Sequence, residues 1–138
     1  MGEQKISYWE NLTEDPREAQ WMWEDVITAI NKSGRKDTLL NPAVLDVGGG
    51  AGEFSKYLNK QGIKCISLDF HDWGSNSDAN QIRGNAYQMP FADQSFDIVH
   101  TRGMFDDAMY RQNFTELLPE VARVLKAGGI LSIHDFKH

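Results

Sequence analysis

Apolar residues near the start of the chain recur every three or four positions, which is the spacing of one helix face. Asp15 can cap the first turn of this helix, and Glu18 stands at the capping-box distance from it. We predict a helix over residues 15–31 that ends before Gly34. We expect the N-terminal segment 1–34 to pack on the rest of the chain through Ala19, Met22, Trp23, Val26 and Ile30.

Further along the chain, short apolar runs replace the helical spacing and predict five strands. These runs lie at residues 43–47, at 63–68, around Ile82, at 95–99 and at 130–133. Their length of a few residues and their bounding glycines and polar residues are typical of strands in a globular core.

The segments between the predicted strands differ in pattern. A short helix from Phe54 is closed by Gly62, and residues 114–125 show a second helical spacing. Pro119 lies inside that second pattern and should start a new helix or kink the old one. Residues 71–80 lack a helical pattern and are predicted to form a loop. Strands that alternate with helices predict an α/β fold with a doubly wound parallel sheet.

The composition fits one soluble globular domain over residues 1–138, because 41% of the residues are hydrophobic and 25% are charged. Neither a signal peptide nor a bilayer-spanning run is recognisable, so we expect a cytoplasmic protein without a membrane partner. The formal net charge is −6 and the basic residues are scattered, which argues against nucleic acid as a partner. Cys65 is the single cysteine, so an intrachain disulfide and a cysteine-based metal cage are excluded.

Candidates for function stand where the predicted strands end, because ligands of such sheets bind at the carboxyl ends of the strands. The first strand is followed by an acid and alternate glycines, namely Asp46, Gly48, Gly50 and Gly52. Missing side chains there let a ligand approach the backbone, and the following helix N-terminus offers N–H donors. Asp69 ends the second strand, where it could accept hydrogen bonds from a ribose diol. The pattern predicts a cofactor that contains a nucleoside.

The spacing of the glycines separates two cofactor classes. A dinucleotide-binding turn has its third glycine three residues beyond the second, whereas Gly52 lies two residues beyond Gly50. Glu53 follows, and a carboxylate beside a helix start repels a pyrophosphate but tolerates a cofactor with an ammonium group and a sulfonium. The charge argument therefore favours S-adenosylmethionine over NAD.

Three motifs in order then carry a family resemblance. Residues 44–52 (Val-Leu-Asp-Val-Gly-Gly-Gly-Ala-Gly) resemble the first motif of class I S-adenosylmethionine-dependent methyltransferases, notably the small-molecule type 11 group related to ubiquinone and menaquinone methyltransferases. Residues 84–97 are similar to the family segment that wraps the adenine, and residues 120–129 to the helix and turn before the fifth strand. The resemblance covers about residues 40–135 and implies a Rossmann-like sheet of about five strands in the order 3-2-1-4-5.

Carried over position by position, the resemblance implies a set of cofactor contacts. Asp46 and the glycines would line the methionine end, Asp69 the ribose, and Asn85 with Ala86 the adenine. The family usually has aspartate where Asn85 stands, although the side-chain carbonyl of asparagine can also accept a hydrogen bond. The expected cofactor-binding residues are Asp46, Gly48, Gly49, Gly50, Gly52, Asp69, Phe70, Asn85, Ala86 and Thr101.

The resemblance also implies methyl transfer to a small organic molecule, an in-line displacement that needs chiefly alignment of the acceptor with the methyl group. An acceptor that carries a proton would gain from a base, for which His100 and His134 are the first candidates, with Arg102 and Asp135 beside them. The histidine spacing matches no zinc-binding helix, so we expect no metal. Six apolar side chains could wall the acceptor or equally pack in the core or in a dimer contact: Tyr8, Trp9, Trp73, Met104, Phe105 and Tyr110.

One alternative stays open at the end of the sequence. The family fold continues after the fifth strand with a helix and an antiparallel strand pair, for which this sequence has no residues, so we expect a truncated methyltransferase core. We favour a homodimer that covers the exposed edge of the fifth strand. The alternative is a non-catalytic S-adenosylmethionine-binding module or regulatory subunit.

Overall fold

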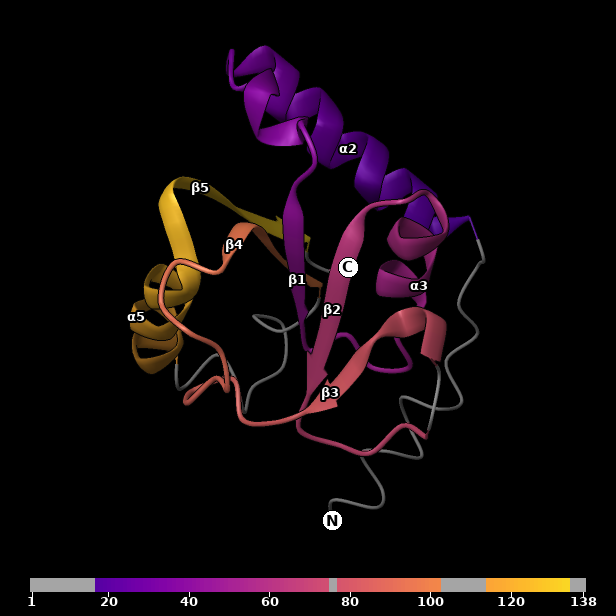
Figure 1. Ribbon diagram of the computed structural model, residues 1–138, viewed down its shortest axis with the longest axis vertical. Helices are drawn as coiled ribbons and strands as arrows, with labels where there is room; N and C mark the ends of the chain where they lie inside the picture. Colours follow the sequence, from indigo (N-terminus) through magenta and orange to yellow (C-terminus); the bar gives the residue numbers. More distant parts are fainter. Residues whose placement is uncertain (1–16, 75–76, 103–113, 135–138) are drawn as a thin grey trace.

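The computed structural model describes residues 17–74, 77–102 and 114–134 (Figure 1). No helix in these ranges is long and apolar enough to cross a membrane. The elements in chain order are α2 (Glu18–Lys32), the 3-10 helix η1 (Lys36–Leu39), β1 (Ala43–Val47), α3 (Glu53–Lys60), β2 (Lys64–Asp69), the 3-10 helix η2 (Ser77–Ala79), β3 (Gln81–Arg83), β4 (Phe96–Arg102), α5 (Phe114–Val124) and β5 (Leu125–His134).

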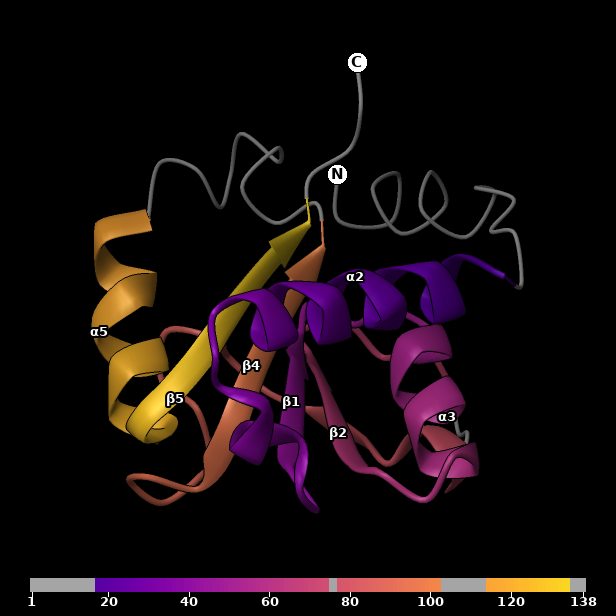
Figure 2. The ribbon, with the colours of Figure 1, turned by 90° about the horizontal axis from the view of Figure 1, so that it is seen from above.

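The five strands form one parallel sheet in the order β3-β2-β1-β4-β5. This arrangement confirms the predicted α/β class and the predicted strand order. Helices α2 and α3 pack on one face of the sheet and α5 packs on the other (Figure 2). Because all five strands run the same way, their carboxyl ends meet at one edge, and this edge positions the candidate site.

Helix α2 fixes one side of that edge. Its buried residues are the five expected from the helical spacing, and they pack with Val44, Phe54 and Leu58. The helix begins at Glu18, later than predicted, and its N-cap residue makes no side-chain capping hydrogen bond. The Glu18 carboxylate forms an ion pair with Arg102 at the end of β4 instead. Asp15, the predicted cap, lies outside the described residues.

The connections around α5 differ from the predicted ones. The helix runs through Pro119 without a new start. Pro119 and Thr115, whose carbonyl loses its helical partner, are both exposed, so solvent can satisfy that carbonyl. Strand β5 begins directly after the helix at Leu125, five residues before the predicted start, and its pairing with β4 is irregular between Phe96 and Ile98.

The crossover between β2 and β3 also differs in part from the prediction. It contains the 3-10 helix η2 where the sequence predicted only a loop. Ala79 of η2 is fully buried. No α-helix occupies the described part of this crossover, so residues 70–74 lie directly against the carboxyl edge of the sheet.

Candidate functional site

The turn between β1 and α3 is shaped by glycines. Gly48, Gly50 and Gly52 have φ values of +73°, +58° and +85°, in the left-handed region that favours glycine. A Cβ on Gly52 would lie 2.5 Å from the Cβ of Ala79, so η2 leaves no room for a side chain there. A Cβ on Gly49 would lie 2.1 Å from Ser67 Oγ. The turn thus needs glycine both for its backbone angles and for its close packing on neighbouring segments.

The amide groups of this turn are used by the chain itself. The N–H groups of Gly48 and Gly49 donate to the carbonyl of Leu68, at 2.7 and 3.3 Å, and Gly52 donates to the carbonyl of Gly49 at 3.0 Å. Gly50 N–H donates to Asp69 Oδ2 at 2.9 Å. A pyrophosphate-binding turn needs such amides to point at the ligand. The observed bonding takes up these four amides, so the donors left to a ligand here are the N–H groups at the start of α3.

Asp69 stands at the end of β2, facing the glycine turn. One carboxylate oxygen accepts from Gly50 N–H and the other accepts from His71 N–H, each at 2.9 Å. Each carboxylate oxygen has two lone pairs, so acceptor capacity for a diol is left. These two bonds fix the carboxylate beside the turn, where the sequence placed the ribose.

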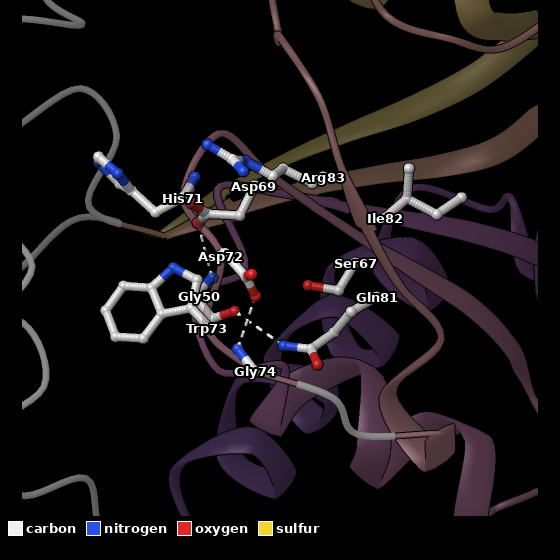
Figure 3. A pocket seen from close by; sticks show the side chains of 10 residues that line it. All are labelled: Gly50, Ser67, Asp69, His71, Asp72, Trp73, Gly74, Gln81, Ile82 and Arg83. Atoms are coloured by element: carbon white, nitrogen blue, oxygen red, sulfur yellow. Dashed lines mark hydrogen bonds between the residues drawn. The ribbon is translucent and has the colours of Figure 1, made fainter.

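A small pocket lies next to Asp69 and has a volume of about 110 Å³ (Figure 3). Trp73 packs over Gly50, with ring atoms 3.9 Å from where a Cβ would be. The Gln81 amide donates to the Gly50 carbonyl at 3.2 Å. Motif comparison missed Trp73, Gln81 and Ser67 as lining residues; for Trp73 the sequence suggested an acceptor wall. The lining residues are Gly50, Ser67, Asp69, His71, Asp72, Trp73, Gly74, Gln81, Ile82 and Arg83.

Asn85 follows β3, at the same carboxyl edge, and is exposed. Gly84 N–H donates to the Asp69 carbonyl at 2.9 Å, which ties this segment to the end of β2. The Asn85 side-chain oxygen accepts from Tyr87 N–H at 2.9 Å and so closes a local turn. Ala86 is half-buried beside it.

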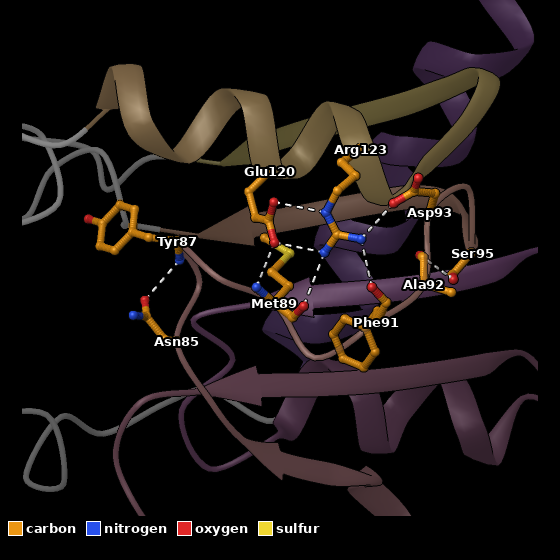
Figure 4. A network of polar contacts seen from close by, with 9 residues as sticks. All are labelled: Asn85, Tyr87, Met89, Phe91, Ala92, Asp93, Ser95, Glu120 and Arg123. Atoms are coloured by element: carbon orange, nitrogen blue, oxygen red, sulfur yellow. Dashed lines mark hydrogen bonds and ion pairs between the residues drawn. The ribbon is translucent and has the colours of Figure 1, made fainter.

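An arginine from α5 holds the continuation of this segment (Figure 4). Arg123 donates to the carbonyls of Phe91 and Met89, at 2.7 and 3.0 Å, and to the carboxylates of Glu120 and Asp93. The hydrogen bond from Arg123 is the main cause that lowers the pKa of Glu120. Glu120 and Arg123 belong to the third motif of the sequence comparison, so the structure gives that motif a physical role: it anchors residues 89–93 to α5.

His100 lies two residues before the carboxyl end of β4. It is 1% exposed, its ring stacks on Phe54 with centroids 4.1 Å apart, and Nδ1 lies 3.2 Å from Ser132 Oγ. Burial, followed by the charges of His134 and Arg102, lowers the pKa of His100 to about 3. His100 is therefore neutral near pH 7 and is shielded from solvent.

His134, at the end of β5, is more accessible. Its ring lies 5.0 Å from that of His100, and Nε2 lies 3.6 Å from Asp25 Oδ2 of α2. Arg102, the next candidate, pairs with Glu18. Asp135, Tyr8, Trp9, Met104, Phe105 and Tyr110 lie outside the described residues.

The remaining predicted contacts are less closely grouped. Phe70 is 57% exposed and points its ring edge-on to His71. Thr101 is fully buried. It pairs with Val47 of β1, and Val47 packs on the face of the sheet that α5 covers. The structure therefore brings together the glycine turn, Asp69 and the 70–74 loop, and it places His100 and His134 in a separate cluster beside α2.

Comparison with known proteins agrees with this geometry. Residues 45–133 match the methyltransferase domain family. A demethylmenaquinone methyltransferase of Corynebacterium glutamicum is 34% identical over 107 residues, which cover 74% of this chain and 45% of that protein. One of Corynebacterium urealyticum is 30% identical over 148 residues, covering 91% of this chain and 63% of the relative. The chain thus spans about half the length of these curated relatives.

Solved structures show the same fold. A SAM-dependent methyltransferase of Methanosarcina mazei has a TM-score of 0.61 at 23% identity, covering 67% of this chain and 51% of that chain. One of Aquifex aeolicus has a TM-score of 0.58 at 21% identity, covering 91% and 74%. The chain belongs to the methyltransferase domain family of class I S-adenosylmethionine-dependent methyltransferases, whose cofactor the sequence predicted.

Proposed function

We propose that the protein transfers a methyl group from S-adenosylmethionine to a small organic molecule and releases S-adenosylhomocysteine. The observation that carries the proposal is the fixed pair of the glycine turn and Asp69, joined by the hydrogen bond from Gly50 N–H to Asp69 Oδ2. In this proposal Asp46 and the turn face the methionine end, Asp69 binds the ribose, and Asn85 accepts from the adenine amino group.

The charges around the turn fit this cofactor. Asp46 is buried below the turn, Asp69 is half-buried beside it and Glu53 is exposed in the first turn of α3. Three carboxylates attract an ammonium and a sulfonium and repel phosphate. When bound, S-adenosylmethionine supplies a methyl carbon that its sulfonium activates for in-line displacement.

The chain's own contribution would be to position the cofactor and to accept a proton. Of the two candidate bases, His134 suits an acceptor that loses a proton better than His100 does. His134 is partly exposed and lies near Asp25, whereas His100 is buried and its pKa of about 3 makes it a very weak base. Thr101, Phe70 and Gly49 remain predicted contacts.

The cofactor is tested by calorimetric titration of the full chain with S-adenosylhomocysteine and, separately, with NAD. We expect saturable binding of the first ligand and none of the second. Binding of NAD alone would overturn the proposal, because the turn would then recognise a pyrophosphate.

Turnover needs its own experiment. The two curated relatives named above are demethylmenaquinone methyltransferases, so the first acceptor class to test is a quinol of that type, assayed by transfer of a labelled methyl group. We expect labelled product from a panel of phenolic and quinol acceptors. Binding without transfer to any member would favour the non-catalytic module instead. A homodimer over the β5 edge is a further prediction, checked by sedimentation equilibrium.

A further inference from the structure

The pocket beside Asp69 contains polar atoms that the chain leaves without partners. Ser67 Oγ, Trp73 Nε1 and Gln81 Oε1 are each shielded from solvent and each lack a hydrogen bond. Buried polar groups are nearly always paired in folded proteins. Other side chains of the described residues, His100 and Thr101 among them, also have such atoms, but only these three belong to residues that line the pocket, where a ligand could complete their bonding.

The three atoms differ in what they need. The Trp73 indole N–H can only donate, the Gln81 carbonyl oxygen can only accept, and the Ser67 hydroxyl can do both. A diol satisfies such a set, because each of its hydroxyl groups donates and accepts. The Asp69 and Asp72 carboxylates also line the pocket together with Arg83, so the two acidic groups outnumber the one guanidinium and favour a neutral hydroxyl ligand over an anion such as phosphate.

The pocket suits one part of a larger ligand. Its volume of about 110 Å³ is small and it is partly open to solvent, so one group of an adenosyl cofactor can enter while the rest lies outside. Trp73 and Gln81 also both lie beside Gly50, with the Trp73 ring 3.9 Å from where a Cβ would be and the Gln81 amide 3.2 Å from the carbonyl, so the pocket is built against the glycine turn.

We propose that Trp73 and Gln81 are additional cofactor-binding residues, which contact the ribose hydroxyls of S-adenosylmethionine beside Asp69. The indole N–H of Trp73 donates to one hydroxyl oxygen and the side-chain carbonyl of Gln81 accepts a hydroxyl proton. The inference rests on the proposed function, because it names further contacts of the same cofactor.

The test is a titration of the full chain with S-adenosylhomocysteine and with its 2′-deoxy and 3′-deoxy analogues. Trp73→Phe keeps the ring and removes the N–H, and Gln81→Met keeps the length and removes the polar atoms. Trp21→Phe and Gln20→Met, on the exposed side of α2, are matched controls. A lost hydrogen bond corresponds to a loss of affinity of roughly fivefold.

We expect about that loss for S-adenosylhomocysteine in both pocket variants and none in the controls. Each pocket substitution should lower the affinity for one of the two deoxy analogues by less than twofold, because that analogue lacks the hydroxyl group that the substituted side chain contacts. Equal losses for all three ligands would mean a structural effect and would overturn the inference, as would unchanged affinity. If the unsubstituted chain bound no S-adenosylhomocysteine, the proposed function itself would fail.

A measurement on the unsubstituted chain covers the case in which a variant does not fold. The indole N–H resonance of Trp73 should shift when S-adenosylhomocysteine is added, whereas that of Trp21 should not. A Trp73 indole resonance that stays in place at saturation would contradict the contact.

Discussion

The carboxyl edge of the sheet has two halves built on different principles. Over β1, β2 and β3, the glycine turn, Asp69 and the 70–74 loop enclose a pocket with unpaired polar atoms. Over β4 and β5, helix α2 contacts the edge through the Glu18–Arg102 ion pair and through Asp25 beside His134, and a buried histidine stacks on Phe54. We call these the pocket half and the covered half. The difference indicates that side chains lining the pocket act on ligand affinity, whereas the packing of the glycine turn and of the covered half acts on stability, in the covered half with a dependence on pH.

The largest effect is expected where the pocket half is most tightly packed. Gly52 and Gly62 have similar backbone angles, with φ values of +85° and +81°, but only Gly52 has a close neighbour. Gly62→Ala should cost about 1–2 kcal/mol in unfolding free energy, from the left-handed backbone alone. Gly52→Ala should cost about 3 kcal/mol, because the new methyl group meets Ala79.

Urea denaturation of both variants measures this difference. Equal losses of unfolding free energy in the two variants would mean that η2 shifts to accommodate the added methyl group. The packing between the glycine turn and η2 would then be less rigid than the structure indicates.

Loss of the Asp69 carboxylate should affect affinity next most strongly. Asp69→Ala removes a charged acceptor for the ribose, and hydrogen bonds to charged groups contribute about 1.5–3 kcal/mol. We expect affinity for S-adenosylhomocysteine to fall on the order of 100-fold.

Asp72→Ala is the matched control for that variant. Asp72 lines the same pocket and accepts a backbone N–H of the same loop, from Gly74 at 2.9 Å, but it is not expected to bind the ribose. Similar affinities of the two variants in calorimetry would contradict the assigned role of Asp69.

The covered half should make the unfolding free energy depend on pH. The pKa of His100 falls from 6.5 to about 3 on burial, so below pH 6.5 the unfolded chain binds a proton that the folded chain does not. The unfolding free energy should therefore decrease as the pH falls, by about 2 kcal/mol between pH 7 and pH 5.

His100→Gln removes this titration and should flatten that part of the stability profile relative to the unsubstituted chain. An unchanged slope in the variant would show that other groups cause the acid sensitivity.

The smallest effect is expected at the surface of the covered half. Asp25, the partner of His134, is 75% exposed. An exposed pair of this kind stabilises by less than about 1 kcal/mol. Asp25→Asn should change the unfolding free energy at pH 6 by less than about 0.5 kcal/mol. A larger change, measured by thermal melting at low salt, would indicate that α2 is held mainly by this contact.

The two halves also differ in how far the sequence predicted them. The strand order, the glycine turn and the position of Asp69 depend on local patterns, and the structure confirms the order and brings turn and acid together. Ile98, His100 and Arg102 lie two residues apart in β4 and therefore share one face of the sheet. What could not be predicted was that Phe54 and α2 would cover this face and bury His100.

The missed features depend on contacts between distant segments. Trp73 reaches Gly50 only because no α-helix fills the described part of the β2–β3 crossover, and periodicity cannot say where a loop will lie. The early start of β5 likewise depends on pairing of Leu125 with Phe96, which no local pattern specifies.

The self-bonded turn has a consequence for the catalytic cycle under the proposed function. The amides of Gly48, Gly49, Gly50 and Gly52 are occupied by hydrogen bonds within the chain, so the acidic groups around the turn distinguish a cationic from a neutral ligand. Methyl donation converts a cationic ligand into a neutral thioether at the sulfur, so the attraction weakens as soon as the reaction is complete. S-adenosylhomocysteine would then exchange readily for S-adenosylmethionine, and added salt should reduce the difference in affinity between these two ligands.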